Sequence, residues 1–320
     1  MKQYSEFSLS KSLPLGERLE RGFSSKLLLF GEYGLMYGAM ALALPFARFE
    51  GRLAFDSDGQ HEDSAAGIRK FFDYLKAKGS ELNLHFQFDL DRFESDLDQG
   101  LYFNSTIPQQ YGVGSSGALV AALFSKYAFP AEIGNNISPG ILKANFAVLE
   151  SFFHGRSSGI DPLVSYLNKP VLIDQEKLVS AIGFDIKQAG IAIGLIDTHI
   201  TSATGPLVQH FINLFNFPEF ESTFNQKYLP ANNACVQSIL SGDFPTFFQN
   251  LEQLVRFEVY HFHEMIPAGF HWMISHAVCS NVYIKLLGSG GGGYLLVFAN
   301  SDDVLNTWAE KKGIQLTPIF

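Results

Sequence analysis

The segment PQQYGVGSSGALVAAL, residues 108–123, decides how this chain can fold. Glycines at 112, 114 and 117 lead into an apolar run that is typical of a buried helix. Glycine lets the backbone approach an anion closely, and a helix N-terminus presents free N–H groups and the positive end of the helix dipole. The segment therefore predicts a helix over residues 115–127 whose N-terminus, together with the loop before it, binds phosphate.

The hydroxyl groups of this loop leave several roles open. Ser115 and Ser116 can cap the helix, contact phosphate or hold Mg²⁺. A plain capped turn with no ligand is the alternative interpretation. The segment is not a Walker A loop, because Ala118 stands where that motif requires lysine, although Gly112 and Gly117 have its glycine spacing.

A second glycine cluster, GSGGGG at residues 288–293, formally contains the GxGxxG pattern of dinucleotide-binding folds. The strand-like sequence YLLVF follows it instead of a helix, and only 320 − 293 = 27 residues remain. Both features argue against a dinucleotide-binding unit. We expect a loop that packs against a ligand or against the phosphate loop, with a flexible hairpin as the alternative.

The third segment, ESFFHGRSSGID at residues 150–161, contains GxSxG. A nucleophile elbow with that pattern needs a strand before it, whereas the apolar spacing here predicts a helix over residues 139–154, so a hydrolase is disfavoured. The more informative pair is Glu150 and Asp161, of which one could hold a metal ion while the other acts as a base. Two solvated surface carboxylates are the alternative.

Composition limits the class of protein. The 320 residues include 23 basic and 32 acidic ones, for a net charge of −9, which argues against nucleic acid as a partner. Two cysteines without a CxxC pair favour a reducing compartment. No apolar run approaches the roughly 20 residues that span a bilayer. We expect a soluble cytoplasmic protein, with no membrane partner and about two domains.

The periodicity of apolar residues predicts an α+β chain with two lobes that divide near residues 184–190. The predicted strands are residues 26–30, 39–46, 52–55, 82–90, 171–173, 191–196, 282–287 and 294–298, with a short one at the end of the chain. The predicted helices are residues 65–78, 115–127, 139–154 and 301–312, and helices dominate from 206 to 279.

Three motifs in this order resemble those of the GHMP kinase superfamily, named for galactokinase, homoserine kinase, mevalonate kinase and phosphomevalonate kinase. They are KLLLFGEYGLMYG at residues 26–38, the phosphate loop at 108–123, and KLLGSGGGGYLLVF at 285–298. Within the superfamily, HGRSSGIDPLVSY at residues 154–166 and IDTHITSATGPLV at 196–208 resemble mevalonate kinases. The motifs span nearly the whole chain.

The resemblance implies a two-lobed fold. Residues 1–186 would form an N-terminal lobe with a left-handed βαβ unit, and residues 187–320 a ferredoxin-like C-terminal lobe, with the active site in the cleft. The implied activity is ATP-dependent phosphorylation of a small-molecule alcohol with Mg²⁺, first of all mevalonate to 5-phosphomevalonate. A homodimer is one expected assembly of such an enzyme. Phosphomevalonate or a sugar as the acceptor, and a non-catalytic sensor on the same fold, are the alternatives.

The resemblance also implies residue roles. Asp161 falls on the catalytic aspartate and Lys26 on the lysine beside it. The ATP phosphates would be bound by Gly112, Gly114, Ser115, Ser116 and Gly117. The Mg²⁺ ion would be bound by Ser116 and Glu150. The acceptor would be bound by Glu32, Tyr33, Thr204 and Gly290. The chain departs from the family pattern at Ser24 and Ser25 (usually Pro-Gly), Tyr33 (usually histidine in mevalonate kinases), Ser157 (often proline) and Pro162 (often asparagine).

Overall fold

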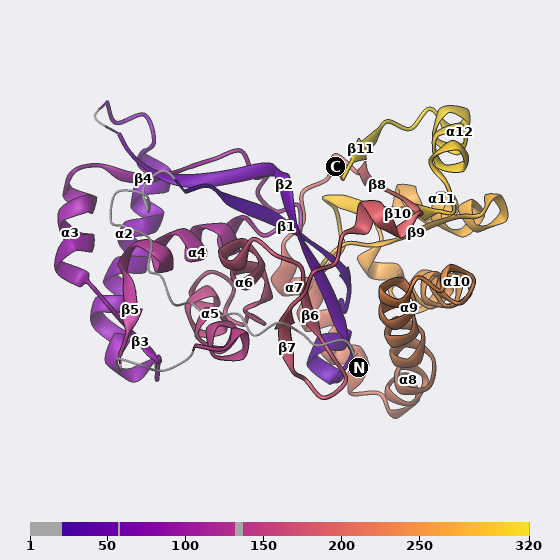
Figure 1. Cartoon of the computed structure of the whole chain (residues 1–320), viewed down its shortest axis with the longest axis horizontal. Helices are drawn as coiled ribbons and strands as arrows, with labels where there is room; N and C mark the ends of the chain where they lie inside the picture. Colours follow the sequence, from indigo (N-terminus) through magenta and orange to yellow (C-terminus); the bar gives the residue numbers. More distant parts are fainter. Residues whose placement is uncertain (1–20, 57, 132–136, 320) are drawn as a thin grey trace.

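Two antiparallel sheets divide the molecule into two lobes (Figure 1). The computed structural model describes residues 21–56, 58–131 and 137–319. Strands β1 and β2 run through the middle of the view, with the N-terminal helices on one side and the C-terminal sheet and helices on the other (Figure 1). The α+β architecture predicted from the sequence is confirmed.

The N-terminal sheet is built around one long strand. Its strands are β1 (Phe23–Phe30), β2 (Ala41–Phe55), β4 (Leu101–Ser105), β6 (Val171–Ile173) and β7 (Val179–Ala181). The two strands predicted over residues 39–46 and 52–55 are a single strand, β2. Gly51 of β2 pairs with Phe23 of β1 and Ser105 of β4, and Ala43 pairs with Leu28 of β1 and Val171 of β6. Since β4 and β6 share one edge of β2 and are both antiparallel to it, they run in the same direction; the left-handed connection between them stays a prediction.

Helices cover this sheet. A small two-stranded ribbon of β3 (Phe86–Phe88) and β5 (Ala128–Pro130) completes the lobe. The helices are α2 (Glu62–Lys78), α3 (Leu90–Asp98), α4 (Ser115–Tyr127), α5 (Pro139–His154) and α6 (Ile160–Leu167), with single turns η1 (Gly34–Tyr37) and η2 (Gly79–Glu81). The bounds predicted for α4 are confirmed. The strand predicted over residues 82–90 is wrong at its ends, because Asp89 accepts a hydrogen bond from the Arg92 backbone N–H and so caps α3.

The C-terminal sheet has the strand order β11-β8-β10-β9, made by β8 (Ala192–Asp197), β9 (Val282–Leu286), β10 (Tyr294–Ala299) and β11 (Leu316–Pro318). With helices after β8 and α12 (Asp302–Lys312) after β10, the chain order is β-α-β-β-α-β, the ferredoxin-like arrangement. The predicted ferredoxin-like lobe is therefore confirmed. Its remaining helical segments are α7 (Thr204–Phe215), α8 (Pro218–Thr223), η4 (Phe224–Tyr228), α9 (Leu229–Ser241), α10 (Phe244–His261), η5 (His263–Met265), η6 (Ala268–Phe270), α11 (His271–Ala277) and η7 (Val278–Ser280).

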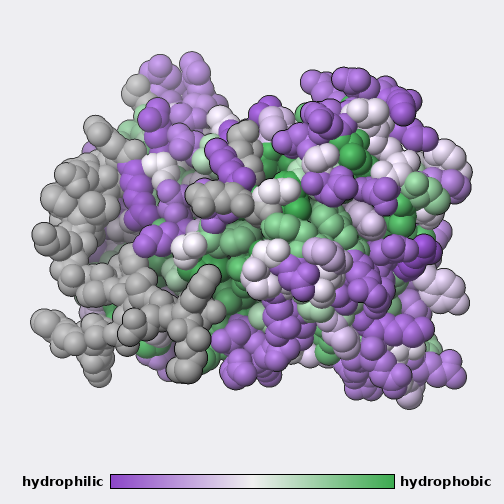
Figure 2. Space-filling view, turned by 45° about the vertical axis from the view of Figure 1, so that its right-hand side comes forward, coloured by the Kyte–Doolittle hydropathy of each residue, from purple (hydrophilic) through white to green (hydrophobic). Residues whose placement is uncertain are grey.

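The segment between the sheets carries the short helix η3 (Ile186–Ala189), where the sequence places the domain boundary. That boundary stays a prediction, as do the cytoplasmic location and the homodimer. No helix in the described part of the chain is long and apolar enough to cross a membrane. Figure 2 shows hydrophilic side chains over much of the C-terminal lobe and hydrophobic ones gathered along the middle of the visible face.

Polar side chains of the C-terminal lobe hold the connection between β1 and β2. The Asn232 side chain of α9 accepts a hydrogen bond from the Gly31 backbone N–H at 3.0 Å and donates one to the Met40 carbonyl at 2.9 Å. The Tyr228 hydroxyl donates to the Glu32 carbonyl at 2.8 Å. Because all these groups are buried, leaving any of them unpaired would cost stability, so the two lobes are fixed to each other at this connection.

A buried charged cluster lies at the same junction. The Lys285 ammonium donates to Glu32 Oε1 at 2.6 Å and to the Leu286 carbonyl at 2.7 Å, and Glu258 Oε2 accepts from the Leu286 backbone N–H at 2.9 Å. Burial raises the pKa of Glu258 to about 8. The positive charge of Lys285 lowers this pKa, and the negative charge of Glu32 raises it by a smaller amount. One ammonium group thus faces two carboxyl groups, and we infer that Glu258 holds a proton at neutral pH.

Glu258→Gln tests this inference. The pKa of Glu258 in the folded protein, about 8, exceeds the ordinary value of 4.5. The contribution of protonated Glu258 to the free energy of unfolding is therefore complete below pH 4.5 and is lost as the pH rises through about 8. One such proton changes the free energy of unfolding by up to about 1.4 kcal/mol per pH unit. Since glutamine mimics the neutral carboxyl group, the variant should lose less stability between pH 5.5 and 8.5 than the wild type, as measured by urea unfolding.

The exposed Glu219→Gln serves as the matched control and should keep the wild-type dependence on pH. Equal pH dependence of the Glu258→Gln and wild-type proteins would show that Glu258 is ionised in the fold.

Candidate active site

The predicted phosphate loop approaches two other elements closely. Gly114, the N-cap of α4, has φ = 83°, a left-handed conformation that favours glycine. A Cβ atom at Gly114 would lie 3.0 Å from Lys26 Cγ and 3.3 Å from Asp161 Oδ2, and one at Gly117 would lie 2.7 Å from Asp161 Cβ. The glycines therefore let Lys26 of β1 and Asp161 of α6 pack against the N-terminus of α4.

Lys26 and Asp161 form an ion pair at this point. The Lys26 Nζ lies 3.1 Å from Asp161 Oδ1, and it also donates to the Gly112 carbonyl at 3.2 Å. The Lys26 backbone N–H donates to the Val113 carbonyl at 2.9 Å, which fixes β1 to the loop. Lys26 is buried and Asp161 is partly exposed, so the carboxylate is the partner that a ligand can reach.

Glu150, near the end of α5, completes the cluster and is only 4% exposed, which excludes a solvated surface carboxylate. Ser116 Oγ donates to Glu150 Oε1 at 3.1 Å, and the Ser157 hydroxyl donates to Oε2. Burial raises the pKa of Glu150, the negative charge of Asp161 raises it further, and the two hydroxyl groups oppose the rise. The carboxyl groups of Glu150 and Asp161 therefore repel each other when both are ionised.

This repulsion between the two carboxylates bears on whether the site could bind a metal ion. A divalent cation beside Ser116 and Glu150 would offset the charge of the two carboxylates, and the oxygen atoms of these residues are the type of ligand that Mg²⁺ takes. The residues fit Mg²⁺ bound together with phosphate oxygens, the manner in which kinases commonly hold it. Among residues 21–56, 58–131 and 137–319, no cluster of three or more His, Cys, Asp or Glu side chains is placed to bind a metal by itself.

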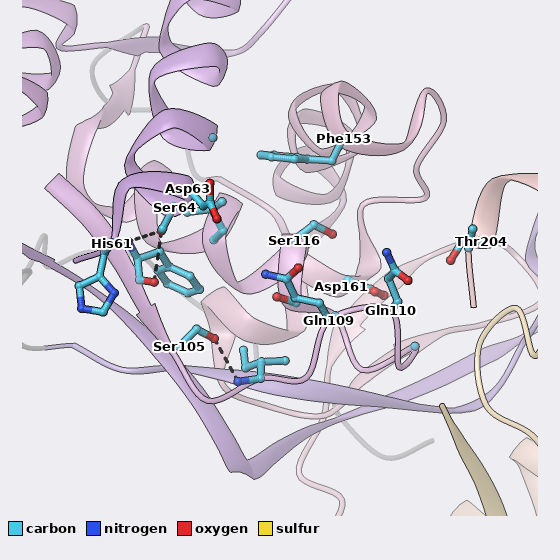
Figure 3. A pocket seen from close by; sticks show the side chains of 18 of the residues that line it. His61, Asp63, Ser64, Ser105, Gln109, Gln110, Ser116, Phe153, Asp161 and Thr204 are labelled. Atoms are coloured by element: carbon cyan, nitrogen blue, oxygen red, sulfur yellow. Dashed lines mark hydrogen bonds between the residues drawn. The ribbon is translucent and has the colours of Figure 1, made fainter. Parts of the chain in front are cut away.

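Two cavities meet at Asp161. The larger, of about 1230 Å³, extends from Asp161 past the N-terminus of α4 to the start of α2. Figure 3 shows Phe153 on one side of it and Ser105 on the other, with Ser116 and Asp161 between them. The smaller cavity, of about 380 Å³, is bounded by three elements: β1, α7 and the segment that precedes α6. It shares Gly112, Asp161 and Thr204 with the larger cavity. A group on Asp161 can therefore face ligands in both cavities.

The residues predicted to contact the acceptor differ in whether they line the two cavities and in how far a ligand could reach them. Tyr33 lines the smaller cavity and its hydroxyl donates to the Ser289 carbonyl at 2.6 Å. Thr204 lines both cavities and its Oγ1 accepts from Ser289 Oγ at 3.2 Å. Glu32 also lines the smaller cavity, but its carboxylate is 2% exposed and paired with Lys285.

Gly290 lies outside the linings of both cavities and packs instead against the Met265 carbonyl group. Its loop does pack against the phosphate loop: a Cβ at Gly293 would lie 2.5 Å from the Tyr111 carbonyl oxygen, and one at Gly112 would lie 3.1 Å from that of Leu287. The role of this loop is thus to support the phosphate loop by close backbone packing.

Sequence reasoning missed two basic residues of the smaller cavity, Lys143 and Arg156. Lys143 lies seven residues before Glu150 on α5, so the helical period places both on one face. That spacing was the available signal for Lys143. Arg156 lies between two glycines of the segment before Asp161, and nothing in its pattern distinguishes it from a surface arginine.

Comparison with known proteins agrees with this geometry. The family described as "GHMP kinases N terminal domain" matches residues 70–169, which include the phosphate loop, Glu150 and Asp161. This part of the chain is similar to the N-terminal domain of GHMP kinases. The resemblance to the GHMP kinase superfamily, predicted from its motifs, is thereby confirmed, and no curated protein is significantly similar to the chain in sequence.

Solved structures of GHMP kinases share the fold over nearly the full length. The L. major mevalonate kinase in complex with R-mevalonate is 16% identical, with a TM-score of 0.59 over 93% of this chain and 95% of that one. The Streptococcus pneumoniae phosphomevalonate kinase in complex with phosphomevalonate and AMPPNP is 14% identical, with a TM-score of 0.59 over 92% and 97%. The Lactococcus lactis galactokinase complexed with galactose is 12% identical, with a TM-score of 0.60 over 93% and 92%. Because these proteins bind different acceptors, the shared fold does not select one.

Gly114→Ala tests whether the loop binds phosphate. The added Cβ would crowd Lys26 and Asp161 in a backbone conformation that already disfavours alanine. We expect roughly tenfold or greater weakening of the affinity for a non-hydrolysable ATP analogue, which corresponds to about 1.4 kcal/mol. Calorimetric titration measures it.

Gly242→Ala is the matched control, because Gly242 has φ = +78° and nothing within 4 Å of its Cβ position. This variant should lose similar stability and no affinity. Unchanged affinity in a folded Gly114→Ala protein would mean that the loop does not hold the phosphates.

Proposed function

We propose that the chain is an ATP-dependent phosphotransferase that phosphorylates a hydroxyl group of a small-molecule alcohol. One observation carries this proposal: the Asp161 carboxylate, paired with Lys26 at 3.1 Å, lies where two cavities meet beside the N-terminus of α4. Phosphoryl transfer depends mainly on positioning and on stabilisation of charge, and this arrangement supplies both.

The larger cavity would bind the nucleotide. The backbone N–H groups at the start of α4 and the glycine loop before it would hold the phosphates at the end nearest Asp161. Ser116 and Glu150 would hold Mg²⁺, which would supply positive charge to offset that of the phosphate oxygens. The rest of the cavity, toward the start of α2, has room for the nucleoside.

The smaller cavity would bind the acceptor. Asp161 would accept the proton of the acceptor hydroxyl as that oxygen bonds to the γ-phosphorus, while the bond from the γ-phosphorus to the bridging oxygen breaks and ADP leaves. The Lys26 ammonium would compensate the charge of Asp161 and of the transferred group. A non-catalytic sensor would need neither this base nor its paired lysine, so the Lys26, Glu150 and Asp161 set favours an enzyme.

Mevalonate is the acceptor that we propose first, with its primary hydroxyl group as the site of phosphorylation. The motifs at residues 154–166 and 196–208 support this choice, and so does the similarity of fold to the L. major mevalonate kinase. Release of ADP from Mg-ATP in the presence of mevalonate, phosphomevalonate, homoserine or galactose tests it. A response to none of the four would overturn the proposed acceptor, and a response to galactose alone would replace it.

A double-mutant cycle tests the pair that carries the proposal. General-base catalysis is worth roughly 10²–10⁴-fold, so Asp161→Asn should reduce kcat by about that factor and leave the affinity for an ATP analogue near that of the wild type. Lys26→Met should also slow the reaction. Because residues that act as a unit are not additive, the double variant should lose less than the product of the two single losses.

Steady-state rates decide this test, with the exposed Asp73→Asn on α2 as the control that should remain active. Full activity of Asp161→Asn would exclude Asp161 as the base, and strictly multiplicative losses would show that Asp161 and Lys26 act separately.

Glu150→Gln tests the proposed Mg²⁺ ligand. A neutral amide holds a hard cation less well than a carboxylate does, so the variant should need a higher Mg²⁺ concentration for half-maximal rate. Titration of Mg²⁺ at saturating ATP measures this, with Glu219→Gln as the control. If the Mg²⁺ dependence of Glu150→Gln equals that of the wild type, Glu150 does not bind the ion.

A further inference from the structure

Two basic side chains of the smaller cavity have no part in the reaction described above. Lys143 is on α5, and Arg156 is in the segment that joins α5 to α6. Within the described part of the chain, neither side chain has an ion pair or a hydrogen bond. The other cavity lysine, Lys26, is paired with Asp161.

The acidic side chains of this cavity, in contrast, already have partners. Asp161 faces Lys26, Glu32 is paired with Lys285 outside the cavity lining, and Glu150 accepts hydrogen bonds from two serine hydroxyl groups. The positive charge that remains for a ligand is therefore that of Lys143 and Arg156.

Burial makes the isolated Lys143 costly. Its side chain is partly buried, and this burial lowers the pKa of Lys143 below its usual value. A partly buried ammonium group loses hydration, and no group in the described residues replaces it here; an anion bound beside Lys143 would compensate its charge. Arg156 is exposed, and its planar guanidinium can bind a carboxylate or a phosphate through two parallel hydrogen bonds.

The position of these residues suits a ligand that also reaches Asp161. A Cβ atom at Gly159 would lie 2.2 Å from the Lys143 carbonyl oxygen, so α5 at Lys143 packs directly against the start of α6, which carries Asp161. Apolar side chains form much of the remaining cavity wall: Leu28, Leu35, Met36, Ile160 and Val208. A ligand with a short apolar carbon skeleton fits between the basic residues and the carboxylate.

We propose that Lys143 and Arg156 bind an anionic group of the acceptor, so that the acceptor is an alcohol bearing a carboxylate or a phosphate and not a neutral sugar. This inference rests on the proposed function, since it specifies the substrate class of the same site. It assigns the choice of acceptor to two residues outside the phosphate loop and outside the Lys26–Asp161 pair.

Binding of a matched pair of alcohols tests the inference. Mevalonate and 3-methylpentane-1,3-diol differ only in that the diol has a methyl group in place of the carboxylate; phosphomevalonate adds a phosphate and galactose is a neutral sugar. Calorimetry with the full-length protein, Mg²⁺ and a non-hydrolysable ATP analogue gives the affinities. We expect the wild type to bind mevalonate or phosphomevalonate at least about tenfold more tightly than the diol or galactose. Tighter binding of mevalonate indicates recognition of the carboxylate, and tighter binding of phosphomevalonate shows that the phosphate adds to the affinity.

Variants then identify the residues responsible. Lys143→Met and Arg156→Met should each weaken binding of the preferred anion by about tenfold or more and leave the affinities for the diol and the ATP analogue unchanged. Lys143→Arg keeps the charge and should retain most of the affinity. Lys70→Met, which removes an exposed lysine of α2, is the control for a change of net charge.

Two results would overturn the inference: diol or galactose binding as tight as that of the anions, or equal losses for charged and neutral ligands in the two variants. Release of ADP separates the two proposals. If galactose releases ADP and both variants behave as the wild type, the kinase proposal stands and this inference is wrong. If the anions bind through Lys143 and Arg156 but release no ADP, the two residues form an anion site, but the kinase proposal is wrong and the anion is not an acceptor.

Discussion

The close packing of Lys26 and Asp161 against a glycine-lined helix N-terminus is the constraint on which the rest of the site depends. Side chains at positions 114 or 117 would occupy the space that these two residues fill. The ion pair in turn joins β1 to α6, two elements that are far apart in the sequence, beside the N-terminus of α4. Ser116 and Ser157 donate hydrogen bonds to Glu150 and hold it in the same cluster. Burial raises the pKa of Glu150, and a nearby cation would lower it again. A single close approach thus sets both the geometry and the electrostatics of the site.

The second lobe supports this arrangement from behind. The glycine loop after β9 packs on the phosphate loop backbone, and Lys285 of the same strand neutralises Glu32 at the edge of the smaller cavity. A buried ion pair of this kind contributes little net stability by itself, but removal of one partner leaves a buried charge, which is strongly destabilising. The pair therefore fixes how the C-terminal lobe meets β1, and the smaller cavity, which we propose binds the acceptor, lies along that contact.

The solved GHMP kinases illustrate how one fold serves several acceptors. Mevalonate, phosphomevalonate and galactose are bound by proteins whose folds resemble this one to a similar degree, so the fold leaves the choice of acceptor open. Under the proposed function, that choice depends on the side chains that line the smaller cavity. In this chain they combine apolar residues with two basic groups that no acidic group of the described chain neutralises, which gives the cavity a chemical character of its own.

The sequence by itself determined the local elements and the residues that can carry chemistry. The apolar run after the glycine loop fixed the bounds of α4, the apolar spacing over residues 139–154 fixed those of α5, and the ordered motifs singled out Lys26, Glu150 and Asp161. Local pattern succeeded there because helix capping and periodicity act over a few residues. Only the tertiary structure decided that two predicted strands form the single strand β2, that Glu32 pairs with a lysine 253 residues away, and that Lys143 and Arg156 share a cavity. Such contacts depend on how distant segments pack, and charge in particular is set by burial and by partners that no local pattern of residues specifies.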